Sequence, residues 1–251
     1  MTKSVDHSTI GAHSLPKEIM DLFLKPVVVE EQHTYAARDF SLFLPVEVTH
    51  VGQVWSIDES KAAAFLKQFH PHPSTQFAEY AGPYGRRPGP AGAFGVVRAI
   101  SPTHLDIFFR LHAEFILVPS VVYTPACFLG RILINRKAGT VDYFQMAVPN
   151  DRAFNLTLTV SVTDPWDVSS LLTSLNFEYV EQMELQGGDG GNLAQNDWED
   201  EIDLEKAHRK LKSIFFKFYD IDWVSSDDVL EIAKEKNRPI LGVVMTSSLD
   251  D

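Results

Sequence analysis

The sequence predicts an α+β protein in which an antiparallel, β-rich domain is followed by a region where helix and strand alternate. The central observation is a two-residue period from Leu105 to Phe115, where every odd position is apolar. This period is typical of a strand with one buried face. Further along, two apolar runs flank Arg136–Gly139, whose glycine tolerates the positive φ of a tight turn, so we expect a hairpin. After residue 200 the pattern changes to helix, polar turn and apolar strand.

Other segments complete the predicted sheet. Phe94–Ile100 precedes the central strand, Asn155–Val162 alternates with threonine and serine on its polar side, and Phe177–Leu185 supplies a further strand. With the hairpin strands, 128–135 and 141–148, these segments are numerous enough to build a hydrophobic core.

The first 55 residues carry weaker signals. The residues up to 17 are polar and predict an arm, and Lys17–Leu24 predicts a short helix. Val27–Val29 and Phe40–Val51 are apolar enough for one or two strands.

A helix is expected over residues 58–69, because Ser56 and Glu59 have the spacing of a capping box. His70–Pro73 contains two prolines, which stop that helix. Tyr80–Gly92 is so rich in glycine and proline that we expect an exposed loop there.

A domain boundary is predicted before residue 200. Gly187–Asn192 is rich in glycine, and six acidic residues follow within Asp197–Glu205. We therefore divide the chain into an N-terminal arm with unassigned strands at 1–55, a β-rich domain at 56–190, and a third region at 200–251.

The third region has a regular pattern. Glu201–Tyr219 predicts a helix, with apolar residues at spacings of three and four: Leu204, Ala207, Leu211, Ile214, Phe215 and Phe218. Ser225–Asp228 predicts the start of a second helix that ends near Asn237. Pro239–Met245 is a continuous apolar run, typical of a strand buried on both faces. Such a strand needs neighbours, and none follows it in the sequence, so we expect either that it joins the earlier sheet as its last strand or that the domain it begins is cut short.

The charge of the chain argues against some partners. The formal net charge is -12, and residues 178–251 hold 18 acidic and 8 basic residues, which gives -10 of that total. An acidic surface repels phosphate groups, so we expect neither nucleic acid nor an anionic membrane as a partner.

The sequence contains one cysteine, Cys127, so no disulfide within the chain and no CxxC motif can form. We find no apolar stretch of the length of a signal peptide or a membrane span. By sequence alone we therefore expect a cytoplasmic location, and we leave the oligomeric state open.

Cysteine and histidine residues are the first candidates for chemistry. Cys127 is a candidate redox residue, although a lone cysteine is more often a small buried apolar residue. His70 and His72 alternate with prolines, and a metal site would require distant histidines in addition: His50, His104 or His112. A rigid turn is the favoured interpretation, so we predict no metal site and no cofactor.

Charged groups are the second set of candidates. His112 shares one strand face with three charged residues, Asp106, Arg110 and Glu114, and together they form a candidate catalytic cluster. We favour a solvated sheet face. Arg86 and Arg87 are candidates for gripping a partner's carboxylates, with a plain loop as the favoured interpretation. The acidic residues of 197–205 attract calcium weakly in one interpretation. In the favoured one they form a solvated linker whose last members stabilise the N-terminus of the next helix electrostatically.

Several blocks of the chain resemble selenoprotein N. They are Phe109–Phe115, Thr124–Asn150, Glu181–Leu185 and Ala233–Asn237 leading to Ser248–Asp251. The resemblance covers roughly residues 60 to 251, with gaps, and its blocks follow the order of the family.

In that family a Ser-Cys-Sec-Gly redox motif follows the Leu-Asp-Asp stretch within a few residues, at the place where a thioredoxin-like fold carries its CxxC motif. The resemblance implies that this chain ends just before the motif. The residues next to it are Ser247, Ser248, Leu249, Asp250 and Asp251. Residues 200–251 would then begin a thioredoxin-like α/β domain, in which a helix N-terminus after the strand stabilises a thiolate or selenolate.

The resemblance also implies partners and a compartment. The intact protein would be a thiol-disulfide oxidoreductase acting on protein thiols and disulfides, linked to calcium or redox homeostasis. Animal members are glycoproteins of the endoplasmic reticulum membrane with a calcium-binding EF-hand. This chain shows no EF-hand loop, so calcium binding is not carried over.

The leading hypothesis is therefore a selenoprotein N-like redox protein whose chain, as it stands, lacks its Cys-Sec motif and is catalytically silent. The rival is a non-catalytic protein-binding or regulatory module. A third hypothesis is a hydrolase using the face of His112, for which we find no suitable nucleophile. A covered and flanked strand at Ile240–Met245 would count against the leading hypothesis.

Overall fold

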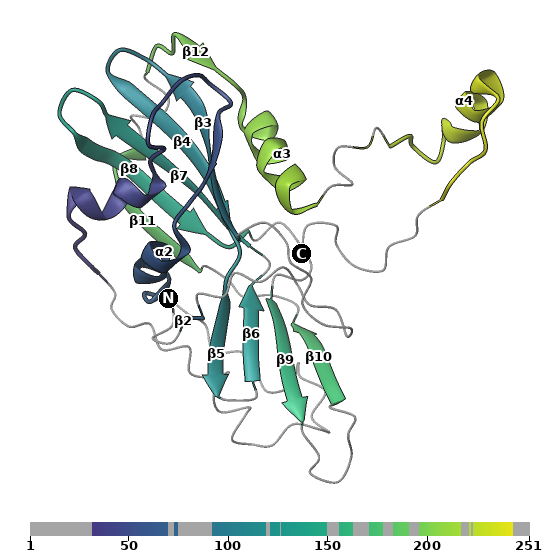
Figure 1. The fold of residues 1–251 in the computed structure, drawn as a ribbon, viewed down its shortest axis with the longest axis horizontal. Coiled ribbons are helices and arrows are strands. Elements are labelled where there is room, and N and C mark those ends of the chain that lie inside the picture. Colours follow the sequence, from purple (N-terminus) through teal and green to yellow (C-terminus); the bar gives the residue numbers. More distant parts are fainter. Residues whose placement is uncertain are drawn as a thin grey trace.

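The structure is a computed structural model. It describes residues 32–69, 73–74, 92–118, 121–125, 127–149, 156–162, 171–177, 183–190, 196–216, 221 and 223–242. Its described part consists of two antiparallel sheets with helices, as shown in Figure 1. The α+β class expected from the sequence is thus confirmed.

The larger sheet, sheet A, has a path of six strands in the order β1-β3-β4-β7-β8-β11, with a seventh, β12, also paired with β3. The strands are β1 (Val54–Ser56), β3 (Ala93–Ile100), β4 (His104–Leu111), β7 (Phe128–Asn135), β8 (Thr140–Ala147), β11 (Glu184–Gly188) and β12 (Asp200–Glu201). The expected hairpin is confirmed as β7 and β8, and Gly139 in its turn has a φ of 68°.

The smaller sheet, sheet B, has five strands in the order β10-β9-β6-β5-β2. They are β2 (Pro73–Ser74), β5 (Glu114–Val118), β6 (Val121–Pro125), β9 (Leu156–Val162) and β10 (Leu171–Phe177). One strand was expected over 105–115, but the chain leaves sheet A at Leu111 and enters sheet B at Glu114. The two-residue period continues across this break, so the sequence does not reveal it.

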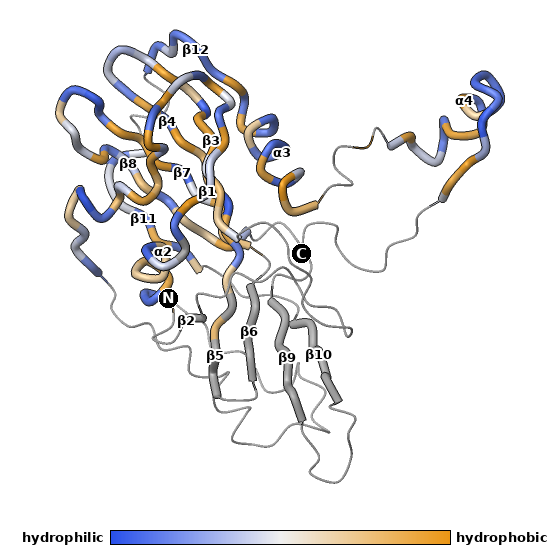
Figure 2. The backbone as a smooth tube through the Cα atoms, viewed as in Figure 1, coloured by the Kyte–Doolittle hydropathy of each residue, from blue (hydrophilic) through white to orange (hydrophobic). Residues whose placement is uncertain are grey.

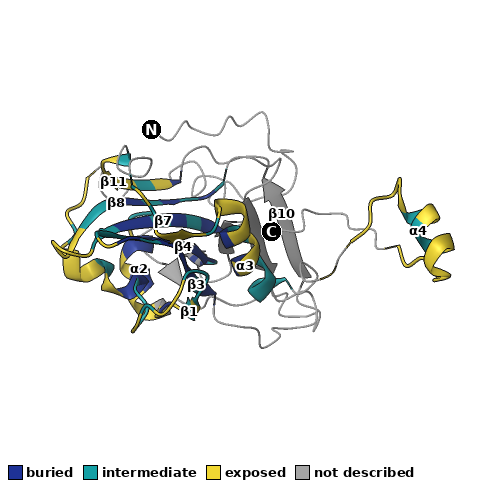
Figure 3. Ribbon diagram, turned by 90° about the horizontal axis from the view of Figure 1, so that it is seen from above, coloured by how far each residue is buried: buried dark blue, intermediate teal, exposed yellow. Residues whose placement is uncertain are grey.

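One face of sheet A packs against two short helices, η1 (Ala37–Phe43), a 3-10 helix, and α2 (Glu59–Leu66). Their aromatic rings meet those of the sheet: Phe43 stacks on Phe109 at 4.4 Å between centroids, and Phe65 lies 5.5 Å from Phe144. In Figure 3 the central strands of the sheet are mostly buried. Aromatic packing of this kind supplies much of the core's stability.

The opposite face of sheet A packs against α3 (Leu204–Phe215). Ala207 and Leu211 of the helix are fully buried against Val96, and β12 leads into the helix from the edge of β3. Asp203 caps the helix by accepting a hydrogen bond from the amide of Lys206 at 2.6 Å. The last acidic residues of 197–205 thus lie at the helix N-terminus, as expected, but the run also contains the strand β12 where the sequence favoured a solvated linker.

The last described helix, α4 (Val229–Lys236), has no buried residue. It stands apart from the two sheets in Figure 1. The apolar residues that follow it stand out in Figure 2. As predicted, the helix ends at Asn237, which adopts the left-handed conformation with a φ of 47°.

Several predicted elements differ from the structure. Part of Phe40–Val51 is the 3-10 helix η1 instead of a strand, because Asp39 accepts a hydrogen bond from the amide of Ala36 and closes a turn. Helix α2 is capped by Asp58 in place of Ser56. The two ends of the strand expected at Phe177–Leu185 belong to different strands, β10 and β11, in different sheets, and residues 178–182 fall outside the described residues.

Some predicted segments fall outside the described residues, so they remain predictions. They are the arm at 1–17, the helix at Lys17–Leu24, Val27–Val29, the loop before Gly92 and the apolar run after Gly242. Among the described residues, no helix combines the length and the apolar content needed to cross a bilayer. The division into three domains also remains a prediction.

Gly130 of β7 is expected to tolerate no side chain. A Cβ atom built there would lie 2.0 Å from Phe109 Cζ and 2.6 Å from the carbonyl oxygen of Gln145, which the sheet holds in place. We expect Gly130→Ala to lower the free energy of unfolding by about 1–3 kcal/mol, measured by urea denaturation. Gly187→Ala in β11 is the matched control, since nothing lies within 4 Å of its Cβ position. Equal stability of the two variants would contradict this packing.

Candidate functional site

The polar residues of the face of sheet A that packs against α3 form the candidate site. On β4 the even-numbered side chains point to this face, and two charged ones, Asp106 and Arg110, are fully buried. The prediction of a solvated sheet face is therefore wrong. Charged residues at alternate positions of a strand suggest a solvated face. Here Asp106 pairs with arginines from other strands, and α3 covers the face.

The first group is an arginine–aspartate cluster, formed by Arg98 of β3, Asp106 of β4, Arg131 of β7 and Glu201 of β12. The guanidinium group of Arg98 donates through Nε to Asp106 Oδ2, and its Nη1 donates to Glu201 Oε2 at 2.9 Å. Arg131 Nη2 donates to Asp106 Oδ2 at 2.6 Å, and its Nε donates to Oδ1 at 3.0 Å. One buried carboxylate thus joins two neighbouring strands to its own.

This cluster also holds the segment that leads into α3. Arg98 Nη1 donates to the carbonyl oxygen of Ile202 at 3.3 Å, and its guanidinium carbon lies 5.2 Å from the ring centroid of Trp198. A cation over an aromatic face is attracted by the ring quadrupole. Arg98 therefore fastens both β12 and the residues on either side of it to the sheet.

The second group is an arginine–histidine cluster, formed by Arg110 and His112 of β4, His208 of α3, and the rings of Phe215 and Phe216. Arg110 Nε donates to His112 Nε2 at 3.0 Å, and its Nη1 lies 3.4 Å from His208 Nε2. The guanidinium carbon lies 5.5 Å and 5.4 Å from the centroids of the two phenylalanine rings. The cluster fastens the C-terminal end of α3 to β4.

His112 is neutral in this arrangement. Since a guanidinium group only donates, His112 Nε2 must be the unprotonated nitrogen, and the ring proton lies on Nδ1. Its ring also packs at 4.4 Å from that of Phe215. Burial, and to a lesser degree the charge of Arg110, lower the pKa of His112 to about 3. Because Arg110 occupies the basic nitrogen, the geometry gives no support to a hydrolase built on His112.

The other predicted histidines do not come together. His50 lies on the surface and its Nδ1 is 2.8 Å from Thr49 Oγ1. His104 Nε2 lies 3.1 Å from Asp142 Oδ2, which joins the β3–β4 turn to the β7–β8 hairpin. His70 and His72 fall outside the described residues. Among the residues that the structure describes, no group of three metal-ligating side chains is present.

The remaining predicted residues are placed as follows. Cys127 is buried, with 1% of its surface exposed, directly before β7. Glu114 begins β5 and so belongs to sheet B instead of the face of His112. Arg86 and Arg87, like the five residues from Ser247 to Asp251, lie outside the described residues. The redox roles predicted for Cys127 and for the residues after Asp251 remain predictions.

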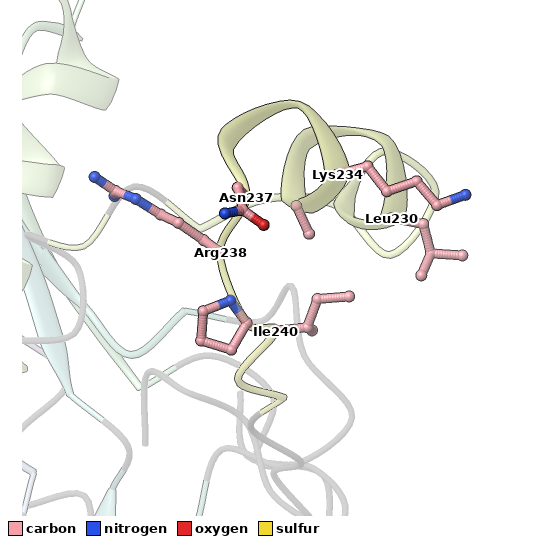
Figure 4. Close-up of a pocket in the computed structure, with 7 residues that line it drawn as sticks. Leu230, Lys234, Asn237, Arg238 and Ile240 are labelled. Carbon is pink, nitrogen blue, oxygen red and sulfur yellow. The ribbon is translucent and has the colours of Figure 1, made fainter.

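A surface depression lies at the end of α4. It has a volume of about 520 Å³ and is lined by Leu230, Ala233, Lys234, Asn237, Arg238, Pro239 and Ile240. In Figure 4 Leu230 and Ile240 lie on the same side of this segment, and Arg238 points away from them. The exposed fractions are 60% for Leu230, 49% for Ile240 and 83% for Leu241. This is an apolar surface without cover from the described residues.

Sequence reasoning missed the partners that make the two clusters. Arg98, Arg131 and His208 occur in elements that were correctly expected, but no local pattern indicates that they meet Asp106 and Arg110. The available signal was that Arg98 is the one charged residue within the otherwise apolar run of β3, which is typical of a strand buried on both faces.

Comparison with known proteins gives one kind of relative. The chain is 27% identical to selenoprotein N of Danio rerio over 300 aligned residues, which cover 100% of this chain and 52% of that protein. It is 24% identical to selenoprotein N of Homo sapiens over 275 residues, which cover 86% of this chain and 44% of the relative. The chain spans about half the length of the curated relatives it matches. No family model matches the chain, and no solved structure matches it.

The arginine–aspartate cluster gives a prediction about stability. Asp106→Asn is expected to lower the free energy of unfolding by about 3 kcal/mol or more, because Arg131 loses its carboxylate partner and Arg98 keeps only the half-exposed Glu201. Glu201→Gln also removes a carboxylate from Arg98, but its side chain is 53% exposed, so we expect a loss of about 0–1 kcal/mol. Urea denaturation at neutral pH measures both. If the two variants lost equal free energies of unfolding, burial of the Asp106 carboxylate would not determine its contribution to stability.

Proposed function

Since the chain is homologous to selenoprotein N across its whole length, we propose that it is the scaffold of a thiol-disulfide oxidoreductase whose Cys-Sec pair directly follows Asp251. In this proposal the residues present here position the redox pair and carry no catalytic group themselves. A link to calcium or redox homeostasis rests on the resemblance alone.

The observation that carries the proposal is the uncovered apolar segment after α4. Ile240 and Leu241 are exposed and follow a helix with no buried residue. Contiguous apolar residues are normally covered, and a run of this kind fits the inner strand of a sheet. A thioredoxin-like domain completed by residues after Asp251 would supply neighbouring strands and helices for it.

The order of the elements supports the same proposal. Helix α4 ends at Asn237, whose left-handed conformation reverses the chain, and Pro239 then opens the apolar run. In a thioredoxin-like fold a helix, a strand and a redox loop follow each other in this order, and the next helix begins at the loop. Because α3 packs on sheet A, the proposed thioredoxin-like part takes its helix from α4.

The chemistry in this proposal belongs to the redox pair. The selenolate attacks a protein disulfide and forms a selenium–sulfur bond as one substrate thiolate leaves. The neighbouring cysteine thiolate then attacks that bond, so that the pair ends oxidised and the substrate is released as two thiols. The residues of this chain would hold the loop at the end of the strand and keep its backbone in place.

The direct test is the composition of the native protein. We expect a mass above 28.2 kDa and one selenium atom per chain, measured by intact-mass and elemental mass spectrometry, together with disulfide reductase activity towards a protein disulfide. A selenium-free native protein that ends at Asp251 would overturn the proposal and leave the non-catalytic binding module.

The segment after α4 provides a second test. In the native protein, amides of residues 240–245 are expected to exchange hydrogen at least about 100-fold more slowly than in residues 1–251 alone, because neighbouring strands pair with them. The amides of β7 are the internal control, since sheet A is already complete. Equal exchange of residues 240–245 in both chains would contradict a strand formed with later residues.

A further inference from the structure

The C-terminal end of α3 is held by one charged and two neutral groups. Arg110 is fully buried, and it contacts both His112 of its own strand and His208 of the helix. Phe215 and Phe216 flank the guanidinium group and complete the contact. The C-terminal end of the helix is therefore docked through the arginine–histidine cluster.

Both hydrogen bonds require unprotonated histidine nitrogens. The guanidinium of Arg110 has donors only, and a protonated imidazole also has donors only, so a protonated His112 or His208 cannot accept from it. Protonation would in addition place two positive charges within hydrogen-bonding distance at a buried site, which is strongly unfavourable. The docked position of α3 therefore excludes a second proton, and with it the positive charge, from both rings.

The described residues around the cluster are mostly apolar or positively charged. From β3 and β7, the residues opposite Arg110 are the apolar Phe94 and Leu129. On β4, Asp106 faces the same side but binds Arg98 and Arg131. From α3, His208 faces the cluster, and the positively charged Lys212 lies one turn later. The charged group that acts on His112 is Arg110.

We propose that Arg110, His112 and His208 form an acid-sensitive latch, which holds the C-terminal end of α3 on β4 at neutral pH and opens as the histidines take up protons. Opening releases the helix end from the sheet and frees the chain that carries α4. This inference is independent of the redox function proposed above.

The direction of the pH dependence follows from the two states of His112. When α3 is docked, the pKa of His112 is about 3, and when α3 is undocked we expect it to return towards the ordinary histidine value of 6.5 as the ring meets water. Docking is therefore fully stable above pH 6.5 and loses stability as the pH falls from 6.5 towards 3. By linkage, the ratio of open to closed molecules rises about tenfold for each pH unit in this window.

Hydrogen exchange on residues 1–251 tests the latch. Exchange rates of α3 and β7 are measured by mass spectrometry at pH 7.5, 6.5 and 5.5, and each is divided by the intrinsic rate at that pH. We expect the protection of the last turn of α3 to fall about tenfold between pH 7.5 and 5.5, while β7 keeps its protection.

Matched variants assign the effect to the two histidines. His112→Gln and His208→Gln each place an amide oxygen near the position of Nε2, which accepts from Arg110 at every pH. We expect the double variant to keep its α3 protection at pH 5.5. His33→Gln is the control, because His33 is exposed and contacts Tyr35, whose ring packs with the core on the η1 side of the sheet. It should lose protection as the unaltered chain does.

Two outcomes would overturn the latch: equal protection of α3 at pH 7.5 and 5.5 in the unaltered chain, or the same loss in the double variant. If the double variant does not fold, the ring signals of His112 in nuclear magnetic resonance decide the question. A His112 that titrates near pH 6.5 while the signals of α3 stay unchanged would show that protonation does not open the contact.

Discussion

The carboxylate of Asp106 is the constraint on which the rest of the structure depends. It lies at the centre of sheet A with no exposure to solvent, and it binds guanidinium groups from the strands on either side. A buried charge is tolerated only when it is paired, so the register of β3, β4 and β7 must bring Arg98 and Arg131 to this point. The same requirement draws Glu201, and with it β12 and α3, onto the face.

The sequence was sufficient to predict those elements whose boundaries depend on a few neighbouring residues. The hairpin of β7 and β8, the start of α4 at Asp228 and its end at Asn237 follow from turn and cap residues whose effect is confined to a few positions. The break between β4 and β5 was invisible, because alternation along a strand does not record which sheet the strand joins. Nor does a pattern of charges on alternate positions distinguish a wet face from one covered by matching charges.

The same distinction explains the candidate site. Asp106, Arg110 and His112 were recognised as a group because they share one strand face. Their partners were not, since Arg131 lies 25 residues from Asp106 and His208 lies 98 residues from Arg110 along the chain. The apolar run after α4 was likewise recognised from its composition, but that composition does not indicate which elements pack against it.

The separation of 103 residues between Arg98 and Glu201 has a consequence for synthesis. At about 5–20 residues per second, a ribosome adds the residues between them in about 5–20 s. During that time β4, β7, β8 and β11 emerge one after another and can pair. The side that α3 will cover still exposes Phe94, Phe108 and the guanidinium of Arg110. The nascent chain thus passes through a state in which this partly apolar sheet face is exposed, because the helix that covers it is synthesised after the strands. Long-range contacts of this kind slow folding, which makes this face a natural point of contact for chaperones.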